Sequence, residues 1–383
     1  MARPTTSKQV SRLTLYAIIT LVSLALIWWS RISLASEAAA GSGAAPVTPI
    51  PSSNTIEEST SDIQNGTLGF EAIFAINLPS RVDKRDNIIL GASASGLDIE
   101  VIDAITPEQI DPKTYPYNWN HAIHRPIEYA ARRSHLNVMQ RILKDGLASA
   151  IIMEDDADWD VTLKTQLRSF ALSVRALQSQ TSDSSTTKAS LYGNDWDIFW
   201  LGHCDPPPHE RPSTSRMTCP ITDRICSIVY AVSFRGAQKI LAALSVSPSG
   251  LAEEIDIGAE FDVSLGRMCG ADYLRCYAPY PALTGGYMAA GSAGKGSAGK
   301  GSAGKGSDIN GPGEDVQDEG EGVREVQGPF SHGVMYSTML NIKRILAGER
   351  TVIATWDDVP VKEIQPGNAG VIEGYIHVPG SQA

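Results

Sequence analysis

Five acidic side chains crowd together directly after a short apolar run near the middle of the chain. The run at 150–153 is typical of a buried strand, and it is followed by Glu154, Asp155, Asp156, Asp158 and Asp160. Carboxylates packed this closely repel one another unless a cation neutralises them. Mg²⁺ and Mn²⁺ prefer such hard oxygen ligands and commonly bridge a protein to a diphosphate. The pattern therefore predicts a divalent-metal site, and the alternative is a solvated acidic turn.

The segments around this motif alternate between strand and helix patterns. Apolar or alternating runs predict strands at 70–78, 97–103, 150–153, 195–202 and 228–232, and helical spacing predicts helices at 127–147, 162–180 and 236–244. The helix at 127–147 is expected to end at Asp145-Gly146, a usual helix stop. This alternation predicts an α/β fold, with a doubly wound, mainly parallel sheet in a single catalytic domain. The acidic motif then falls at the carboxyl end of a strand, where ligands bind in such sheets.

The N-terminus carries the features of a membrane anchor. Residues 13–29 are an uncharged apolar stretch preceded by Arg3, Lys8 and Arg12. Its length is near the lower limit for a spanning helix, and the positive-inside rule keeps the basic end in the cytosol. We expect a cytosolic tail at 1–12, a transmembrane signal anchor at 13–29 and a lumenal remainder, which is a single-pass type II protein of the Golgi or endoplasmic reticulum membrane. The alternative is a signal peptide cleaved near Ala35.

Composition divides the rest of the chain. Residues 30–66 are rich in Ala, Gly, Ser, Thr and Pro and are expected to form a flexible stem. We assign 67–345 to the catalytic domain and 346–383 to a C-terminal extension. Three copies of Gly-Ser-Ala-Gly-Lys at 291–305 mark a low-complexity insertion, assigned to 286–328. The net charge of −11 and the scattered basic residues argue against a nucleic-acid partner.

Five cysteines lie between positions 204 and 276 without a Cys-x-x-Cys spacing. A zinc site is therefore not expected, and disulfides are the default in a lumenal compartment. Two pairings of near neighbours are available, Cys219 with Cys226 and Cys269 with Cys276, but the sequence leaves the connectivity open.

Five blocks of sequence, in order, resemble glycosyltransferase family 25 and in particular its fungal members. They read Phe-Ala-Ile-Asn-Leu-Pro-Ser-Arg-x-x-Lys-Arg at 74–85, Arg-Arg-Ser-His-Leu-Asn at 132–137, Met-Glu-Asp-Asp-Ala-Asp-Trp-Asp at 153–160, Trp-Asp-Ile-Phe-Trp-Leu-Gly-His-Cys at 196–204 and Ala-Val-Ser-Phe-Arg-Gly-Ala-Gln-Lys-Ile at 231–240. The family includes bacterial lipooligosaccharide galactosyltransferases and animal collagen galactosyltransferases. The resemblance covers about residues 70–345.

The resemblance implies a GT-A-like, inverting enzyme that moves a hexose from a nucleotide sugar to a glycan or glycoprotein acceptor. It favours UDP-galactose as the donor and Mn²⁺ or Mg²⁺ as the cofactor. The metal ligands would be Asp156 and Glu154, with Asp158 as an alternative. The residues expected to contact the nucleotide are Asn77, Arg81, Arg85, Asp103, Arg133, Asn137, Glu154 and Asp155. The expected catalytic residues are Asp262 as the favoured general base, Glu260 and His135.

Several of these assignments have ordinary structural alternatives. His135 shares a helix with Arg133 and Asn137 but is offset from their common face, so it is equally read as a packing residue. Arg81 and Arg85 are also what an exposed helix needs for solubility. At the level of the whole protein, the alternatives are a metal-dependent phosphohydrolase or nuclease and a non-catalytic glycan-binding protein on the same fold.

Overall fold

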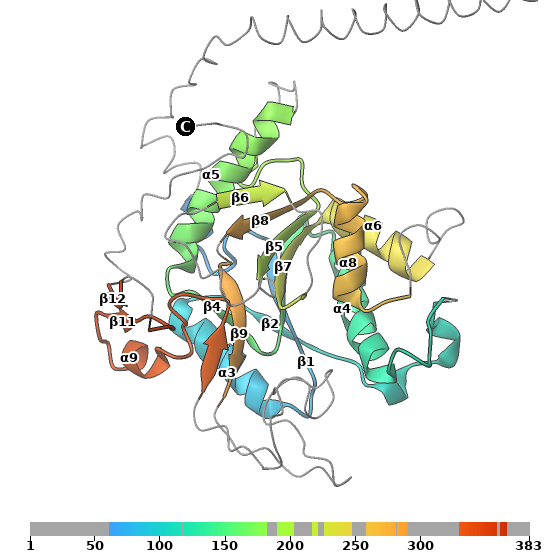
Figure 1. Cartoon of the computed structure of the whole chain (residues 1–383), viewed down its shortest axis with the longest axis horizontal. Helices are drawn as coiled ribbons and strands as arrows, with labels where there is room; N and C mark the ends of the chain where they lie inside the picture. The colour runs from blue at the N-terminus through green and yellow to red at the C-terminus, as the bar shows by residue number, and fades with distance from the viewer. Residues whose placement is uncertain are drawn as a thin grey trace, which may run out of the picture. The chain divides into compact units, whose positions relative to one another are not determined.

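The computed structural model describes residues 61–116, 118–181, 190–202, 217–220, 226–246, 258–280, 282–289, 329–357 and 361–365 (Figure 1). All of them belong to one compact unit, Ile56–Ala383. The predicted tail, the anchor at 13–29, the stem up to residue 60 and the repeats at 291–305 lie outside the described residues. Among the helices that the structure describes, none is both long and apolar enough to cross a bilayer.

A seven-stranded sheet of order β2-β1-β3-β7-β5-β8-β6 forms the centre of this unit. The strands are β1 (Ala72–Asn77), β2 (Glu100–Asp103), β3 (Ser149–Glu154), β5 (Ile198–Gly202), β6 (Met217–Pro220), β7 (Val229–Ser233) and β8 (Cys276–Tyr280). Five strands run parallel to one another, whereas β7 and β6 run in the opposite direction. The prediction of a mainly parallel sheet is therefore confirmed. The reversal of β7, which lies between β3 and β5, was not predicted.

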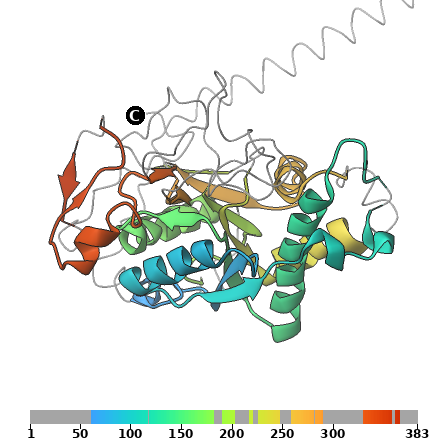
Figure 2. The same ribbon diagram turned by 90° about the horizontal axis from the view of Figure 1, so that it is seen from below.

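Helices cover both faces of the sheet. The helices α3 (Val82–Ser95) and α5 (Leu163–Thr181) pack on one face, and α4 (Pro126–Asp145), α6 (Phe234–Leu241) and α8 (Phe261–Gly270) pack on the other (Figure 1, Figure 2). Successive side chains of β3 alternate between the two layers, with Ile151 and Met153 in the first core and Ala150 and Ile152 in the second. Strands buried on both faces need continuous apolar runs, which explains the run at 150–153.

Helix α4 shows how local sequence sets an element's limits. It begins with Pro126, which is preorganised for a first helical position, and the carboxylate of Glu128 accepts a hydrogen bond from the backbone N–H of Arg125. It ends at Gly146, whose φ of 71° lies in the left-handed region that glycine tolerates. The predicted helix end at this position is confirmed.

A second, three-stranded sheet of order β10-β9-β4 joins the acidic segment to the C-terminal part of the domain. It contains β4 (Ala157–Trp159), β9 (Thr284–Met288) and β10 (Phe330–His332), so β9 extends into the stretch predicted as an insertion. Beyond it, Val352 packs against Met335 and Tyr336. The remaining described elements include α9 (Ile342–Leu346) and the strand pair β11 (Val352–Ile353) and β12 (Glu363–Ile364). The others are short helical segments, namely the 3-10 helices η1 (Ser61–Gln64), η2 (Pro107–Gln109) and η3 (Pro112–Thr114) and the π-helix η4 (Ala242–Val246).

A disulfide links Cys269 at the end of α8 to Cys276 at the start of β8. This is one of the two near-neighbour pairings that the sequence offers. Cys226 is disulfide-bonded as well. Cys226, Cys269 and Cys276 therefore serve as structural cross-links in this part of the chain.

Candidate functional site

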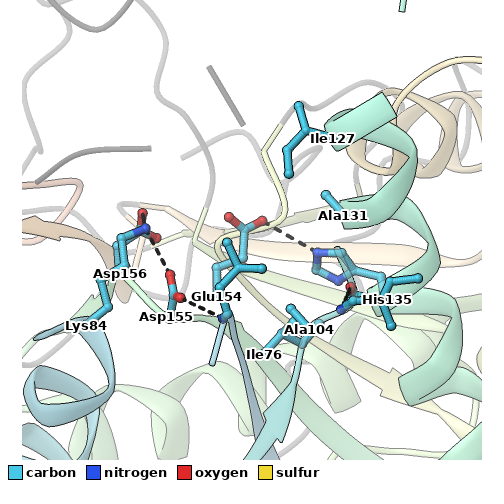
Figure 3. A pocket seen from close by; sticks show the side chains of 12 residues that line it. Ile76, Lys84, Ala104, Ile127, Ala131, His135, Glu154, Asp155 and Asp156 are labelled. Atoms are coloured by element: carbon cyan, nitrogen blue, oxygen red, sulfur yellow. Dashed lines mark hydrogen bonds and ion pairs between the residues drawn. The ribbon is translucent and has the colours of Figure 1, made fainter. Parts of the chain in front are cut away.

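Three neighbouring parallel strands end at the same edge of the sheet. The last residues of β2, β1 and β3 are Asp103, Asn77 and Glu154, with Asn77 beside Asp103 and Ile76 beside Glu154 in the register. An open pocket lies at this edge (Figure 3). Its lining divides into apolar side chains and a polar group: Ile76, Leu78, Ala104, Ile105, Ile127 and Ala131, and then Lys84, Ser134, His135, Glu154, Asp155 and Asp156.

Asp155 is a buried member of the acidic motif and ties β3 to β1. Its Oδ2 accepts hydrogen bonds from the side-chain amide of Asn77 (2.9 Å) and the backbone N–H of Leu78 (3.3 Å), while Oδ1 lies 2.9 Å from the ammonium of Lys84. Burial raises the pKa of Asp155, although Lys84 works against that shift. Asn77 and Asp155, both predicted to contact a nucleotide, therefore also bind each other.

Asp156 faces the same ammonium. The Nζ of Lys84 lies 3.1 Å from Asp156 Oδ2, and Lys84 itself is 6% exposed. Part of the neutralisation that crowded carboxylates require thus comes from a lysine of α3. The sequence analysis did not single out Lys84, although it belongs to the first block that resembles family 25. Its position in the first turn of a helix directly after a strand was the available signal.

Glu154 is held from two sides. The hydroxyl of Ser227 donates to Oε1 (2.6 Å), and His135 Nε2 lies 3.7 Å from the same oxygen. His135 in turn lies 3.0 Å from the hydroxyl of Tyr230 through Nδ1, and its ring stacks on Phe261 with centroids 4.4 Å apart. Burial would raise the pKa of Glu154, but contacts with His135, Ser227 and Lys84 outweigh it and hold that pKa below its ordinary value.

The geometry leaves two carboxylate oxygens of the motif available. Within the described part of the chain, Glu154 Oε2 and Asp156 Oδ1 accept no hydrogen bond and pair with no cation. Two hard oxygen ligands suit Mn²⁺ or Mg²⁺, which fill their other positions with water and substrate phosphates. The residues present therefore fit a divalent ion at Glu154 and Asp156.

Asp158 faces away from this pocket and is fully buried. Its Oδ2 accepts from the hydroxyls of Ser331 (2.7 Å) and Ser337, and its Oδ1 accepts from the backbone N–H groups of Trp159 (2.8 Å) and Met339 (3.2 Å). Burial raises the pKa of Asp158 despite these bonds. Three of these four hydrogen bonds fasten β4 to the segment 331–339, and Asp158 does not line the pocket. These contacts indicate a structural role for Asp158, and its predicted metal contact stays a prediction.

Three predicted nucleotide residues, at the start of α3 and the end of β2, do not line the pocket. Arg81 makes a two-point ion pair with Asp83, with its Nε 3.0 Å from Oδ1 and its Nη2 3.1 Å from Oδ2. Arg85 and Asp103 are exposed. Their nucleotide contacts stay predictions.

Arg133 and Asn137 lie on a different side of α4 from His135. The guanidinium Nε of Arg133 donates to Asn137 Oδ1 (2.9 Å), as their i, i+4 spacing suggests. Arg133 lines a separate pocket with Tyr115 and Ser245. The expected divergence of His135 from these two side chains is observed, and only His135 reaches the acidic pocket.

The two predicted catalytic acids of α8 do not line the pocket either. Glu260 Oε1 lies 2.9 Å from His124 Nδ1, which is 3.4 Å from Glu128 Oε2; the ligand atoms of these three residues lie within 4.8 Å of one another. Asp262 accepts from the backbone N–H of Cys226 (3.0 Å). Burial raises the pKa of Asp262, and the charges of Glu154 and Glu260 add to the shift.

A mainly parallel α/β domain with an acidic pocket at its strand ends has the arrangement of a ligand-binding enzyme domain. Residues 70–256 match the family model described as glycosyltransferase family 25 (LPS biosynthesis protein). Over these residues the chain is similar to glycosyltransferase family 25, and the resemblance found in the five sequence blocks is confirmed at the level of the family.

Curated relatives cover only part of this chain. Procollagen galactosyltransferase 1 of Danio rerio is 27% identical over 206 residues, which are 47% of this chain and 30% of the relative. Procollagen galactosyltransferase 1-A of Xenopus laevis is 26% identical over 193 residues (46% and 29%). A probable inactive glycosyltransferase 25 family member 3 of Bos taurus is 20% identical over 189 residues (46% and 29%). The chain spans less than a third of the length of these relatives.

Proposed function

We propose that the chain transfers a hexose from a nucleotide sugar to a hydroxyl of a glycan or protein acceptor, with inversion at the sugar carbon. The family match supports a glycosyltransferase, and the names of the relatives favour galactose as the sugar and UDP-galactose as the donor. One observation carries the proposal further. Glu154 and Asp156 each present an unpaired oxygen at a pocket formed by the ends of parallel strands.

In the proposed reaction, the acceptor oxygen forms a bond to the anomeric carbon while the bond from that carbon to the diphosphate oxygen breaks. The electron pair leaves with the diphosphate. Glu154 and Asp156 would hold Mn²⁺, which when bound compensates the charge of the leaving group. Lys84 adds a positive charge at the same place.

The proton of the acceptor hydroxyl requires a general base. We retain Asp262 for this task because burial raises its pKa and so makes it a better proton acceptor than an ordinary aspartate. His135 is better placed to position Glu154, because its Nε2 faces Oε1 of that residue. The apolar side chains on the other wall of the pocket, including Ile127 and Ala131, would exclude water from the bound donor.

The proposal includes the remaining expectations from the sequence. These are a GT-A-like arrangement, a type II signal anchor at 13–29 and a lumenal site in the Golgi or endoplasmic reticulum. The apolar stretch and its basic flank support the anchor, and the small sheet that continues directly from the acidic motif supports the GT-A-like arrangement. Protection of the catalytic domain from protease in intact microsomes tests the topology.

The decisive experiment is a transfer assay with the detergent-solubilised full chain. Each of a panel of nucleotide sugars is supplied with Mn²⁺ and simple glycosides as acceptors, and both sugar transfer and nucleotide release are measured. We expect transfer from UDP-galactose that stops in excess chelator. Release of phosphate without any transfer would establish a phosphohydrolase instead, and nucleotide binding without turnover would establish a non-catalytic binding protein.

A further inference from the structure

A buried ammonium lies inside the acidic motif (Figure 3). Lys84 comes from the first turn of α3, whereas Asp155 and Asp156 come from the turn after β3. Its Nζ lies 2.9 Å from Asp155 Oδ1 and 3.1 Å from Asp156 Oδ2. A charge this deeply buried persists only when it is paired. The chain therefore brings its own cation to the place where the sequence predicts a metal ion.

We propose that Lys84 is the resident counter-ion of the acidic motif and sets the ligand preference of the site. It weakens the binding of a divalent ion alone and strengthens the binding of a nucleoside diphosphate together with that ion. The proposal rests on the proposed function, since it concerns the same donor site. If Lys84 has this role, the metal ion binds tightly only when the diphosphate is also bound.

The charge balance gives the reason for the first effect. Glu154, Asp155 and Asp156 in their ionised forms carry three negative charges, of which Lys84 cancels one. A divalent ion entering the site alone also competes with the ammonium for Asp156, whose Oδ2 is already engaged. Both factors lower the affinity for the metal ion.

The fixed position of the ammonium gives the reason for the second effect. Asp155 is locked by Asn77 and by the backbone N–H of Leu78, so Lys84 stays at this edge whenever Asp155 does. Asp156 is the more exposed partner, with 25% of its side chain accessible. It can turn toward a metal ion while Lys84 remains on Asp155 and faces the phosphates. A lysine supplies a compact point charge that suits this task.

The two basic side chains nearest in sequence, at the start of α3, do not offer this charge. Arg81 is paired with Asp83, and Arg85 is exposed. Neither lines the pocket, whereas Lys84 does. The effect is therefore expected from substitution of Lys84 and not from the general loss of a positive charge.

The test measures two affinities in the full-length protein, namely Mn²⁺ alone and UDP at a fixed Mn²⁺ concentration, both by titration calorimetry. Lys84→Met removes the charge and keeps much of the side-chain volume. We expect about 10-fold tighter Mn²⁺ binding and about 10-fold weaker UDP binding, because a full charge acts at a few ångströms. Lys84→Arg keeps the charge and should leave both affinities within about 3-fold of wild type.

A matched control is Lys144→Met, which removes an exposed charge at the far end of α4 and should change neither affinity. If Lys84→Met does not fold, Lys84→Gln replaces it, because the amide can still donate to Asp155. Opposite changes in the two affinities support the proposal. Equal losses of both affinities, or values equal to those of Lys144→Met, overturn it. Absence of UDP binding in the wild type would count against the proposed function, while the Mn²⁺ measurement would still decide the proposal for Lys84.

Discussion

Two aspartates of one motif are expected to respond in opposite ways to the same truncation. Asp156 lines the pocket and has one unpaired oxygen, whereas Asp158 is buried and accepts four hydrogen bonds. Asp156→Ala removes a proposed metal ligand, so turnover should fall by roughly 10²-fold or more with little change in stability. Asp158→Ala should instead destabilise the fold.

The size of the second effect follows from the donors left behind. The hydroxyls of Ser331 and Ser337 can rotate toward each other, but the two backbone N–H groups bonded to Asp158 cannot find new acceptors. Leaving such groups unsatisfied costs roughly 1–3 kcal/mol each, and some of this is offset because a buried charge is removed. We expect a net loss of about 3 kcal/mol, which lowers Tm by roughly 6–12 °C.

Thermal unfolding and initial transfer rates of both variants test this assignment. Asp158→Asn is the control, because its amide oxygen can still serve the backbone donors and its NH₂ can donate to the hydroxyls; it should lose less than about 1 kcal/mol. A stable Asp158→Ala protein that has lost its Mn²⁺-dependent rate would refute the reasoning. So would an Asp156→Ala protein with wild-type turnover.

Three further outcomes are expected elsewhere in the domain. Tyr230→Phe removes the partner of His135 Nδ1 and should lower turnover roughly 10-fold with little change in Tm, as measured by parallel rate and melting assays. Burial would raise the pKa of Asp197, but Lys239 and neighbouring donors hold that pKa below its ordinary value. The ionised carboxylate of Asp197 therefore stabilises the fold above about pH 4, and this contribution is lost as the pH falls through the lowered pKa. Asp197→Asn should thus cost about 2 kcal/mol at pH 7, and the difference in denaturant melts should close as the pH falls below the lowered pKa of Asp197. Replacing Cys269 and Cys276 by serine opens a loop with a sequence separation of 7 and should cost about 2.5 kcal/mol in denaturant unfolding.

The curated relatives of this chain differ in whether their descriptions give them as active enzymes. One of them carries the description of a probable inactive glycosyltransferase, so a family 25 domain alone does not guarantee turnover. Whether the pocket binds Mn²⁺ and UDP is a better criterion for an active enzyme than the family match alone. A site that binds Mn²⁺ and UDP through Glu154, Asp156 and Lys84 has kept the donor machinery, and the affinity measurements report this directly.

Local sequence determined much of this domain. The apolar runs of β1 and β3 are long enough to be buried on both faces, and Glu154, Asp155 and Asp156 line a pocket at the edge of the sheet where the sequence placed them. The end of α4 at Gly146 followed from glycine's tolerance of the left-handed conformation. Ordered sequence blocks were sufficient to indicate the family. These features depend on residues that are neighbours in the chain.

Tertiary structure decided which side chains share the pocket. Asp156 and Asp158 are two positions apart and would share one face of a continuous strand, but a turn at 155–156 separates β3 from β4 and sends them in different directions. Lys84 meets Asp156 across 72 positions, and Ser337 meets Asp158 across 179. Contacts at such separations depend on how α3, the turn after β3, β4 and the segment after β10 pack, because each of these supplies only one side of a contact. The sequence therefore predicted that an acidic site exists, whereas the packing determined which acids face the ligand and which cation already neutralises them.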